Sequence, residues 1–327
     1  MKRLAGVKAV FILGVLAGIV VGSAGPGWGA EGGTRPLSMG GAFVALADDV
    51  HSVTWNPAGM AWQEDSEVTV SAVLNNRDQY ISGDFISDDY IAAVVPLKAG
   101  WRDNFHSWGA AGVYFHNSGM DTGSSQLNVY QPGVSYGCKF PGSETMAWGA
   151  SLSYYMMDGE IPGASETEDA LSVNLGYLWY VWPQMSVGFL WENVNEPSYA
   201  LFGNSARLVR VLRPGVAYYF DEETVVTLDM YDATGNTKDR GADFSQDLRM
   251  GFEHYWTDWL ATRLGLHNFF SAVETSTYVS FGIGLERSDY MGMTPIHYYL
   301  DYSVMYWPDA VSGMQNVTHQ VGVTFRF

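Results

Sequence analysis

The chain ends in Asn316-Val317-Thr318-His319-Gln320-Val321-Gly322-Val323-Thr324-Phe325-Arg326-Phe327, and this stretch sets the pattern that most of the chain repeats. Successive side chains of a β-strand point to opposite faces. In an extended backbone the odd-numbered residues therefore make an apolar face broken only by His319, and the even-numbered residues make a polar or small face. Lipid outside and a polar lumen inside a transmembrane β-barrel require this alternation. The edge strand of a soluble sandwich also alternates, so the rest of the chain must distinguish the two folds.

The same alternation recurs along most of the chain. Apolar residues from Leu171 to Val181, for example, alternate with Ser172, Asn174 and Gly176. Stretches of this kind read as strands with one apolar and one polar face. The sequence predicts fourteen strands, near 66–75, 90–98, 106–117, 127–140, 145–157, 170–182, 185–194, 210–220, 224–233, 244–256, 259–269, 276–287, 295–307 and 316–327.

The connections between these strands alternate in length for most of the chain. Pro183-Gln184 and Thr257-Asp258 are minimal turns, whereas the connections over 76–89 and 158–169 are long and polar. Outer-membrane barrels have short periplasmic turns and longer outer loops. A soluble sandwich has no reason to alternate its loops in this way. The sequence therefore predicts an all-β fold, an antiparallel transmembrane β-barrel of about 14 strands over residues 66–327.

The N-terminus carries an export signal. Lys2, Arg3 and Lys8 precede the apolar run Ala9–Val21, and small residues follow it. This order is typical of a secretory signal peptide, which we assign to residues 1–30, with two possible cleavage sites near residues 24 and 29. A retained membrane anchor is the alternative, but the apolar run is short for spanning a bilayer.

Composition excludes several classes of function. Without residues 1–30 the chain keeps 14 basic and 35 acidic residues, a formal charge of −21, which argues against nucleic acid as a partner. Cys138 is the single cysteine, so an internal disulfide is excluded. No spacing of Ser, His and acidic residues marks a catalytic triad, and we expect neither an enzyme, a cofactor nor a metal site. The 12 Trp and 20 Tyr suit a membrane interface.

One N-terminal stretch resembles a known family. Arg35-Pro36-Leu37-Ser38-Met39-Gly40-Gly41-Ala42-Phe43-Val44-Ala45-Leu46-Ala47-Asp48-Asp49, continuing to Trp55-Asn56-Pro57-Ala58-Gly59, is similar to the N-terminus of FadL-type outer-membrane proteins and of the related PorV/PorQ group. The resemblance implies that residues 31–65 form a hatch, or plug, folded inside the barrel lumen. The residues expected to shape that hatch are Gly40, Gly41, Asp48, Asp49, Asn56, Pro57 and Gly59.

The resemblance also implies two functions. FadL-type proteins take up hydrophobic small molecules passively, typically long-chain fatty acids, across the bacterial outer membrane. PorV-type relatives are non-transporting scaffolds or partners in protein secretion. Expected partners are outer-membrane lipid and lipopolysaccharide, a hydrophobic ligand, and the barrel-insertion machinery, because the terminal Phe327 resembles the C-terminal signal of such barrels.

Charged residues at inward-facing positions of the later strands form a candidate lumen network. A charge buried in a narrow barrel must be paired. We therefore interpret these residues as ion pairs that hold the barrel's shape, with a polar path or a binding site as the alternative. They are Asp229, Arg249, Glu253, Arg263, Glu286, Asp301 and Arg326.

The third and fourth strands contain residues that weaken strand pairing. Gly109 and Gly112 lie in the third strand and Pro132 lies in the fourth. Glycine in a strand often marks a bulge, and proline cannot donate to the ladder. The sequence predicts an inward kink or a lateral gap between these strands, through which a substrate would leave. A harmless tapering of the wall is the alternative.

Overall fold

A computed structural model describes residues 32–74, 85–97, 109–121, 126–236, 246–267, 278–291, 294–306 and 317–327. The signal peptide predicted over residues 1–30 lies outside these ranges, as does residue 31 at the start of the expected hatch. No helix within the described residues is long and apolar enough to cross a membrane.

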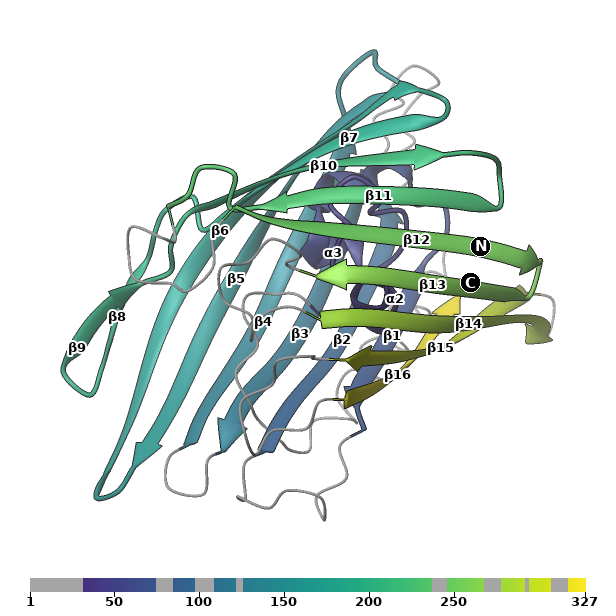
Figure 1. Ribbon diagram of the computed structural model, residues 1–327. Helices are drawn as coiled ribbons and strands as arrows, with labels where there is room; N and C mark the ends of the chain where they lie inside the picture. The colour runs from purple at the N-terminus through teal and green to yellow at the C-terminus, as the bar shows by residue number, and fades with distance from the viewer. Residues whose placement is uncertain are drawn as a thin grey trace.

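Fourteen strands of the described chain close into one antiparallel barrel (Figure 1). Each strand pairs with its neighbours in sequence, and β1 pairs with β16 to close the ring. The barrel strands are β1 (Glu67–Val73), β2 (Phe85–Leu97), β3 (Gly109–Asp121), β4 (Gln126–Lys139), β5 (Met146–Ile161), β6 (Ala164–Trp182), β7 (Met185–Glu192), β10 (Val211–Tyr219), β11 (Thr224–Tyr231), β12 (Asp247–Thr257), β13 (Leu260–His267), β14 (Tyr278–Met291), β15 (Thr294–Tyr306) and β16 (Val317–Arg326). The predicted fourteen-stranded barrel is confirmed.

A short hairpin was not predicted from the sequence. It consists of β8 (Ser198–Leu201) and β9 (Asn204–Arg207), and forms a separate two-stranded sheet within the connection between β7 and β10. Four-residue strands carry too few alternating positions to be recognised by periodicity.

The alternation predicted for the last strand is present in the barrel. Gln320 and Thr324 are buried on the lumen side of β16, whereas Phe325 points outward and is 41% exposed. Leu171 and Leu264, at outward positions of β6 and β13, are about half exposed. Soluble monomers rarely expose so continuous an apolar surface. The barrel therefore carries an apolar outer belt around a polar wall that faces the lumen.

The wall is higher on one side than on the other. We call β4, β5 and β6 the high wall, with 14, 16 and 19 residues, and β7, β10 and β11 the low wall, with 8, 9 and 8 residues. Figure 1 shows β5 and β6 extending well beyond the ends of β7, β10 and β11, with the β8–β9 hairpin beside their outer ends.

The N-terminal residues 32–66, which we call the inner segment, lie inside the barrel (Figure 1). They form α2 (Thr34–Ser38), α3 (Ser52–Trp55) and the 3₁₀ helix η1 (Pro57–Trp62). Helices this short are not stable alone in water, so the surrounding wall must hold them. The inner segment contacts strands on every side, from β2 through β6 to β13–β16.

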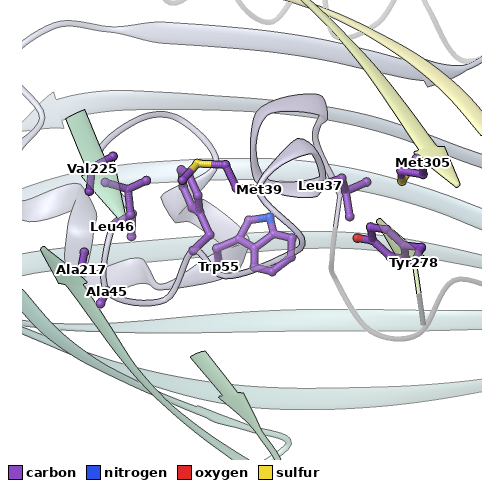
Figure 2. Packing of buried hydrophobic residues seen from close by; sticks show 11 residues of the cluster. Leu37, Met39, Ala45, Leu46, Trp55, Ala217, Val225, Tyr278 and Met305 are labelled. Atoms are coloured by element: carbon purple, nitrogen blue, oxygen red, sulfur yellow. The ribbon is translucent and has the colours of Figure 1, made fainter. Parts of the chain in front are cut away.

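The largest apolar cluster joins the inner segment to the wall. Figure 2 shows Leu46 of the inner segment beside Val225 and Leu37 near Met305 and Tyr278, with Met39 and Trp55 between them. Burying a side chain of this size contributes about 1.5–3 kcal/mol. The wall residues of the cluster are Ala217, Val225, Tyr278 and Met305.

Candidate functional site

The Asn-Pro turn connects the inner segment to the barrel wall. The Asn56 amide nitrogen donates to the Val44 carbonyl at 2.8 Å and to the Tyr177 carbonyl of β6 at 3.1 Å. Its amide oxygen accepts from the Ala58 N–H at 3.2 Å, and Pro57 occupies the first turn of η1, where no donor is needed. The sequence predicted this turn from its local backbone geometry. The structure shows in addition that Asn56 bonds the wall.

Glycines allow the inner segment and the wall to approach each other closely. Gly40 and Gly41 have positive φ angles of 65° and 71°, which glycine adopts without strain. A Cβ on Gly40 would lie 2.6 Å from the Leu266 backbone nitrogen of β13, and one on Gly176 of β6 would lie 2.2 Å from the Asn56 amide oxygen; Gly59, where a Cβ would lie 2.0 Å from the Ala47 carbonyl oxygen, instead lets two parts of the inner segment pack closely. Larger residues in place of Gly40 or Gly176 would therefore push the inner segment away from the wall.

Wall side chains hold the backbone of the inner segment from several directions. Each bond satisfies a buried backbone group of the inner segment. The bonds are Asp229 Oδ2 from the Val44 N–H at 2.9 Å, Ser186 Oγ to the Ala45 carbonyl at 2.6 Å, Ser135 Oγ to the Val53 carbonyl at 2.6 Å, and Ser280 Oγ to the Ser38 carbonyl at 2.9 Å.

Arg35 is the electrostatic centre of the inner segment. Its guanidinium donates to both carboxylate oxygens of Glu253 on β12, at 2.9 and 2.6 Å. It also donates to Asp48 at 2.5 Å and to Asp49 at 2.8 Å. Burial alone would lower the pKa of Arg35, but the carboxylates of Asp48, Glu253 and Asp49 outweigh it and hold that pKa above its ordinary value. One cation thus ties the acidic pair of the inner segment to the wall.

Asp49 also contacts a histidine of the inner segment. Its carboxylate accepts from the His51 N–H and lies 2.9 Å from His51 Nδ1. Burial raises the pKa of Asp49, but His51 and Arg35 together hold that pKa well below its ordinary value. The negative charge of Asp49 therefore stabilises the folded form of the inner segment, which is the form that docks against the wall.

The charges predicted to form one lumen network fall into separate groups. Glu253, Arg263 and Asp301 make one chain, with bonds of 2.6 Å and 2.5 Å. Arg326 pairs with Glu67 at 2.5 Å, and the second oxygen of Glu67 accepts from the Val50 N–H of the inner segment at 2.7 Å.

The remaining members of that prediction lie apart from this chain. Glu286 lies 3.2 Å from His297 Nδ1, Asp229 bonds the inner segment, and the Arg249 guanidinium lies 4.7 Å from the centre of the Tyr231 ring. The prediction treated these charges as pairs within the wall, whereas two of them, Asp229 and Glu253, bond the inner segment.

Sequence reasoning did not single out Arg35 or Glu67. A signal for Arg35 was present, because it is the one basic residue between Gly32 and Glu67 other than histidine. A lone cation in a buried segment requires an acidic partner. For Glu67, at the start of an ordinary strand, no local signal distinguishes it.

The predicted gap between the third and fourth strands is wrong in the described residues. β3 and β4 pair without a break from Gly109↔Cys138 to Asp121↔Gln126. Glycine keeps its N–H and so keeps the ladder. Gly112 instead makes room for the inner segment, because a Cβ there would lie 2.6 Å from Val53 Cγ2.

Pro132 affects the pairing of β4 with its other neighbour, β5. The register of β4 with β5 is interrupted between Tyr130↔Met156 and Gly133↔Ser153. Proline lacks the N–H that would bond one neighbouring strand only. The parity of Pro132 in β4 decides which neighbour that is, and here it is β5.

The outer mouth of the lumen carries an apolar cluster, which we call the mouth cluster. Tyr155, Met157 and Ala170 of the high wall are buried there, with Val129, Tyr199 and Leu208 packed against them. The β8–β9 hairpin reaches over the lumen side of β5, where a Cβ on Gly159 would lie 2.8 Å from the Phe202 ring.

Below the mouth cluster the lumen wall of β3–β6 is polar. Tyr114 bonds Ser153 at 2.5 Å, and the Asn174 amide donates to Ser151 at 3.0 Å and to Ser153 at 3.2 Å. Passing inward from the mouth, the high wall thus presents an apolar patch, a polar band and then the inner segment. Among the residues that the structure describes, no three His, Cys, Asp or Glu side chains gather as metal ligands.

Comparison with known proteins shows the type of barrel. No protein-family model and no curated protein matches the chain. Solved structures do match over most of its length. The Ralstonia pickettii toluene transporter TbuX is 16% identical, with 90% of this chain and 97% of that one covered at a TM-score of 0.54. A Pseudomonas aeruginosa FadL homologue is 13% identical, with 94% and 98% covered at a TM-score of 0.53.

A third similar structure is a deltaS2S3 mutant of the monoaromatic hydrocarbon channel TodX. It is 13% identical, with 92% of this chain and 98% of that one covered at a TM-score of 0.57. Identities this low establish the fold alone. The FadL-type barrel predicted from the N-terminal motif is confirmed as the fold of this chain.

Proposed function

We propose that this protein is a bacterial outer-membrane channel for the passive uptake of hydrophobic small molecules. The observation that carries the proposal is the barrel fold, which the chain shares over nine tenths of its length with a toluene transporter. Fold alone does not define a substrate, so the proposal rests also on the surfaces described above. Long-chain fatty acids and monoaromatic hydrocarbons are the two substrate classes to be compared.

The outer surface supports a place in the outer membrane. Trp182, Trp256 and Trp259, at the short turns, are 61%, 64% and 56% exposed. Rings that are apolar with one polar edge favour the membrane interface and form girdles at the ends of outer-membrane barrels. Together with the apolar belt, these tryptophans support insertion with the short turns in the periplasm and the β8–β9 hairpin outside.

The mouth cluster supports capture of an apolar compound. Its ring and thioether side chains, Tyr155 and Met157, would exchange their contact with the hairpin for contact with a ligand. An apolar ligand that enters such a site is driven mainly by loss of apolar surface from water. The inner segment lies across the lumen beyond this cluster, so passage requires it to shift.

Uptake by cells tests the proposal. Cells that make the protein should take up radiolabelled toluene or palmitate faster than cells that lack it. The variant Met157→Gln should slow that uptake, and Asp158→Asn, which alters the exposed, outward-facing neighbour of Met157 on β5, serves as the matched control. Uptake equal to that of cells without the protein, at normal levels of folded barrel, would contradict the proposal.

A non-transporting scaffold of the PorV kind is the second candidate. The observation in its favour is the number of bonds and ion pairs that hold the inner segment in the lumen. A scaffold needs a rigid barrel and no path. Absence of uptake for both substrate classes, together with a secreted or surface protein that co-purifies with the intact barrel, would favour this second function.

A further inference from the structure

The low wall carries a short apolar belt. On β7 the outward side chains from Met185 to Trp191 are apolar, and the polar Asn193 follows just beyond the strand, where φ is 51° and the side chain accepts from Ser172 Oγ at 2.7 Å. On β10 the outward apolar residues run from Leu212 to Phe220, where Arg210 precedes them. No outward residue within these two stretches is charged.

The high wall carries a longer belt. On β5 the outward residues are apolar from Met146 to Met156, and the next outward position is the exposed Asp158. On β6 they are apolar from Leu171 to Val181, and Asp169 lies directly beyond Leu171. Polar residues therefore bound the belt on both walls, but at different heights.

The difference in height can be worked from strand geometry. A strand rises about 3.3 Å per residue, and a tilt of about 40° leaves about 2.5 Å along the barrel axis. Ten residue steps on the high wall then span about 25 Å, the usual apolar band of an outer-membrane barrel. Six steps on β7 and eight on β10 span only about 15 and 20 Å by the same rise and tilt.

Polar side chains held by specific contacts form the upper boundary of the low wall. Moving these side chains into lipid would cost free energy. The Asn195 side chain accepts from the Val173 N–H at 2.9 Å and donates to the Leu171 carbonyl at 2.7 Å. The Asn193 amide donates to the Val209 carbonyl at 2.9 Å. The Arg210 guanidinium lies 5.8 Å from the centre of the Trp191 ring, a pair suited to the headgroup level.

We infer that the low wall is a membrane-thinning surface, beside which the bilayer is held about 5–10 Å thinner than beside the high wall. Lipid covers this surface, because the side chains of its strands alternate strictly between the two faces of the wall. The outward side chains between the polar boundaries are all apolar. The inference rests on the membrane location given under the proposed function and not on transport. A bilayer meets a short belt by thinning, by tilting the protein, or by protein association.

Spin labels at two matched positions test the inference. In a Cys138→Ala background, Glu196→Cys places a label just above the low wall, and Thr167→Cys places one just above the belt of the high wall. Barrels are reconstituted in dimyristoyl-, dipalmitoleoyl- and dioleoyl-phosphatidylcholine vesicles, and each label's collisions with oxygen and with a water-soluble nickel chelate are measured. If the bilayer thins beside the low wall, the labels at positions 196 and 167 should be equally accessible to the nickel chelate in all three lipids.

Two outcomes would overturn the inference. The first is a Glu196 label that passes into the oxygen-rich acyl region as the lipids lengthen, while the Thr167 label stays in water. The second is a Phe189→Cys label that oxygen cannot reach when a Leu152→Cys label on the high wall is reached, because a second copy of the chain would then cover the low wall. Normal label behaviour without uptake would contradict the transport function alone.

Discussion

Removing the charge of Arg35 should release the inner segment from the wall. The change is Arg35→Gln, which keeps a polar side chain but deletes the contacts with Glu253, Asp48 and Asp49. Arg35 and Glu253 lie 218 residues apart in sequence, so this pair acts only when the inner segment is docked. The barrel strands, by contrast, do not depend on it.

The size of the effect follows from burial. Removing one partner of a buried ion pair typically costs about 3–5 kcal/mol. Glu253 retains Arg263 and Asp49 retains His51, so the lower end of that range applies here. A loss of about 3 kcal/mol in docking raises the population of the undocked segment by about a hundredfold.

Single-channel recording in planar bilayers measures this population as open probability. Arg35→Gln should open on the order of a hundred times more often than the wild type, with an unchanged heat-modifiable shift on gels. Arg287→Gln is the matched control, because the Arg287 side chain is exposed on the outward face of β14. Equal open probability for the wild type and both variants would refute the docking role of Arg35.

The double variant Arg35→Gln/Glu253→Gln separates the pair from its surroundings. If the two residues act through each other, the double variant should open less than the two single changes added together. Strict additivity would show that each residue acts on its other neighbours instead.

Four further outcomes are expected. Deleting residues 31–55 should leave a folded barrel with a larger and longer-lived conductance; equal conductance would place the segment's role elsewhere. Deleting Phe327 should lower the folded yield in outer-membrane fractions, and an unchanged yield at all growth temperatures would contradict its role in assembly. Gly176→Val, whose side chain would strike Asn56, should destabilise the folded barrel by about 1–3 kcal/mol, measured by urea titration. Because the pKa of Asp49 is held low, its negative charge stabilises docking above a pH of about 4, and this stabilisation is lost as the pH falls below that value. The open probability of the wild type should therefore rise in acid, and that of Asp49→Asn should rise less.

The alternation of apolar and polar residues predicted most of the fold. The last strand shows why, since the outward direction of Phe325 and the inward direction of Gln320 are local properties of an extended chain. A two-residue period does not depend on which strand lies alongside. The same reasoning located all fourteen barrel strands but missed β8 and β9, because four residues contain too little of the period.

The sequence predicted which residues shape the inner segment, but not which wall residues they contact. The glycines and the Asn-Pro turn require particular backbone angles, which sequence reveals. The bond from Asn56 to Tyr177 and the seat against Gly176 arise only when β6 passes beside the turn. No local pattern states which wall strand an inner turn will meet.

The barrel strands, their faces and the turn residues were predictable from the sequence, because each depends on a few neighbouring side chains and on backbone sterics. Only the tertiary structure decided which charges pair and which ladder a proline breaks. Glu253 could have been assigned to any cation of the lumen until closure of the barrel placed Arg35 and Arg263 on either side of it. Pro132 breaks the ladder with β5 and spares the one with β3, because the strand that faces its backbone nitrogen is known only once β4 is placed between its two neighbours in the closed barrel.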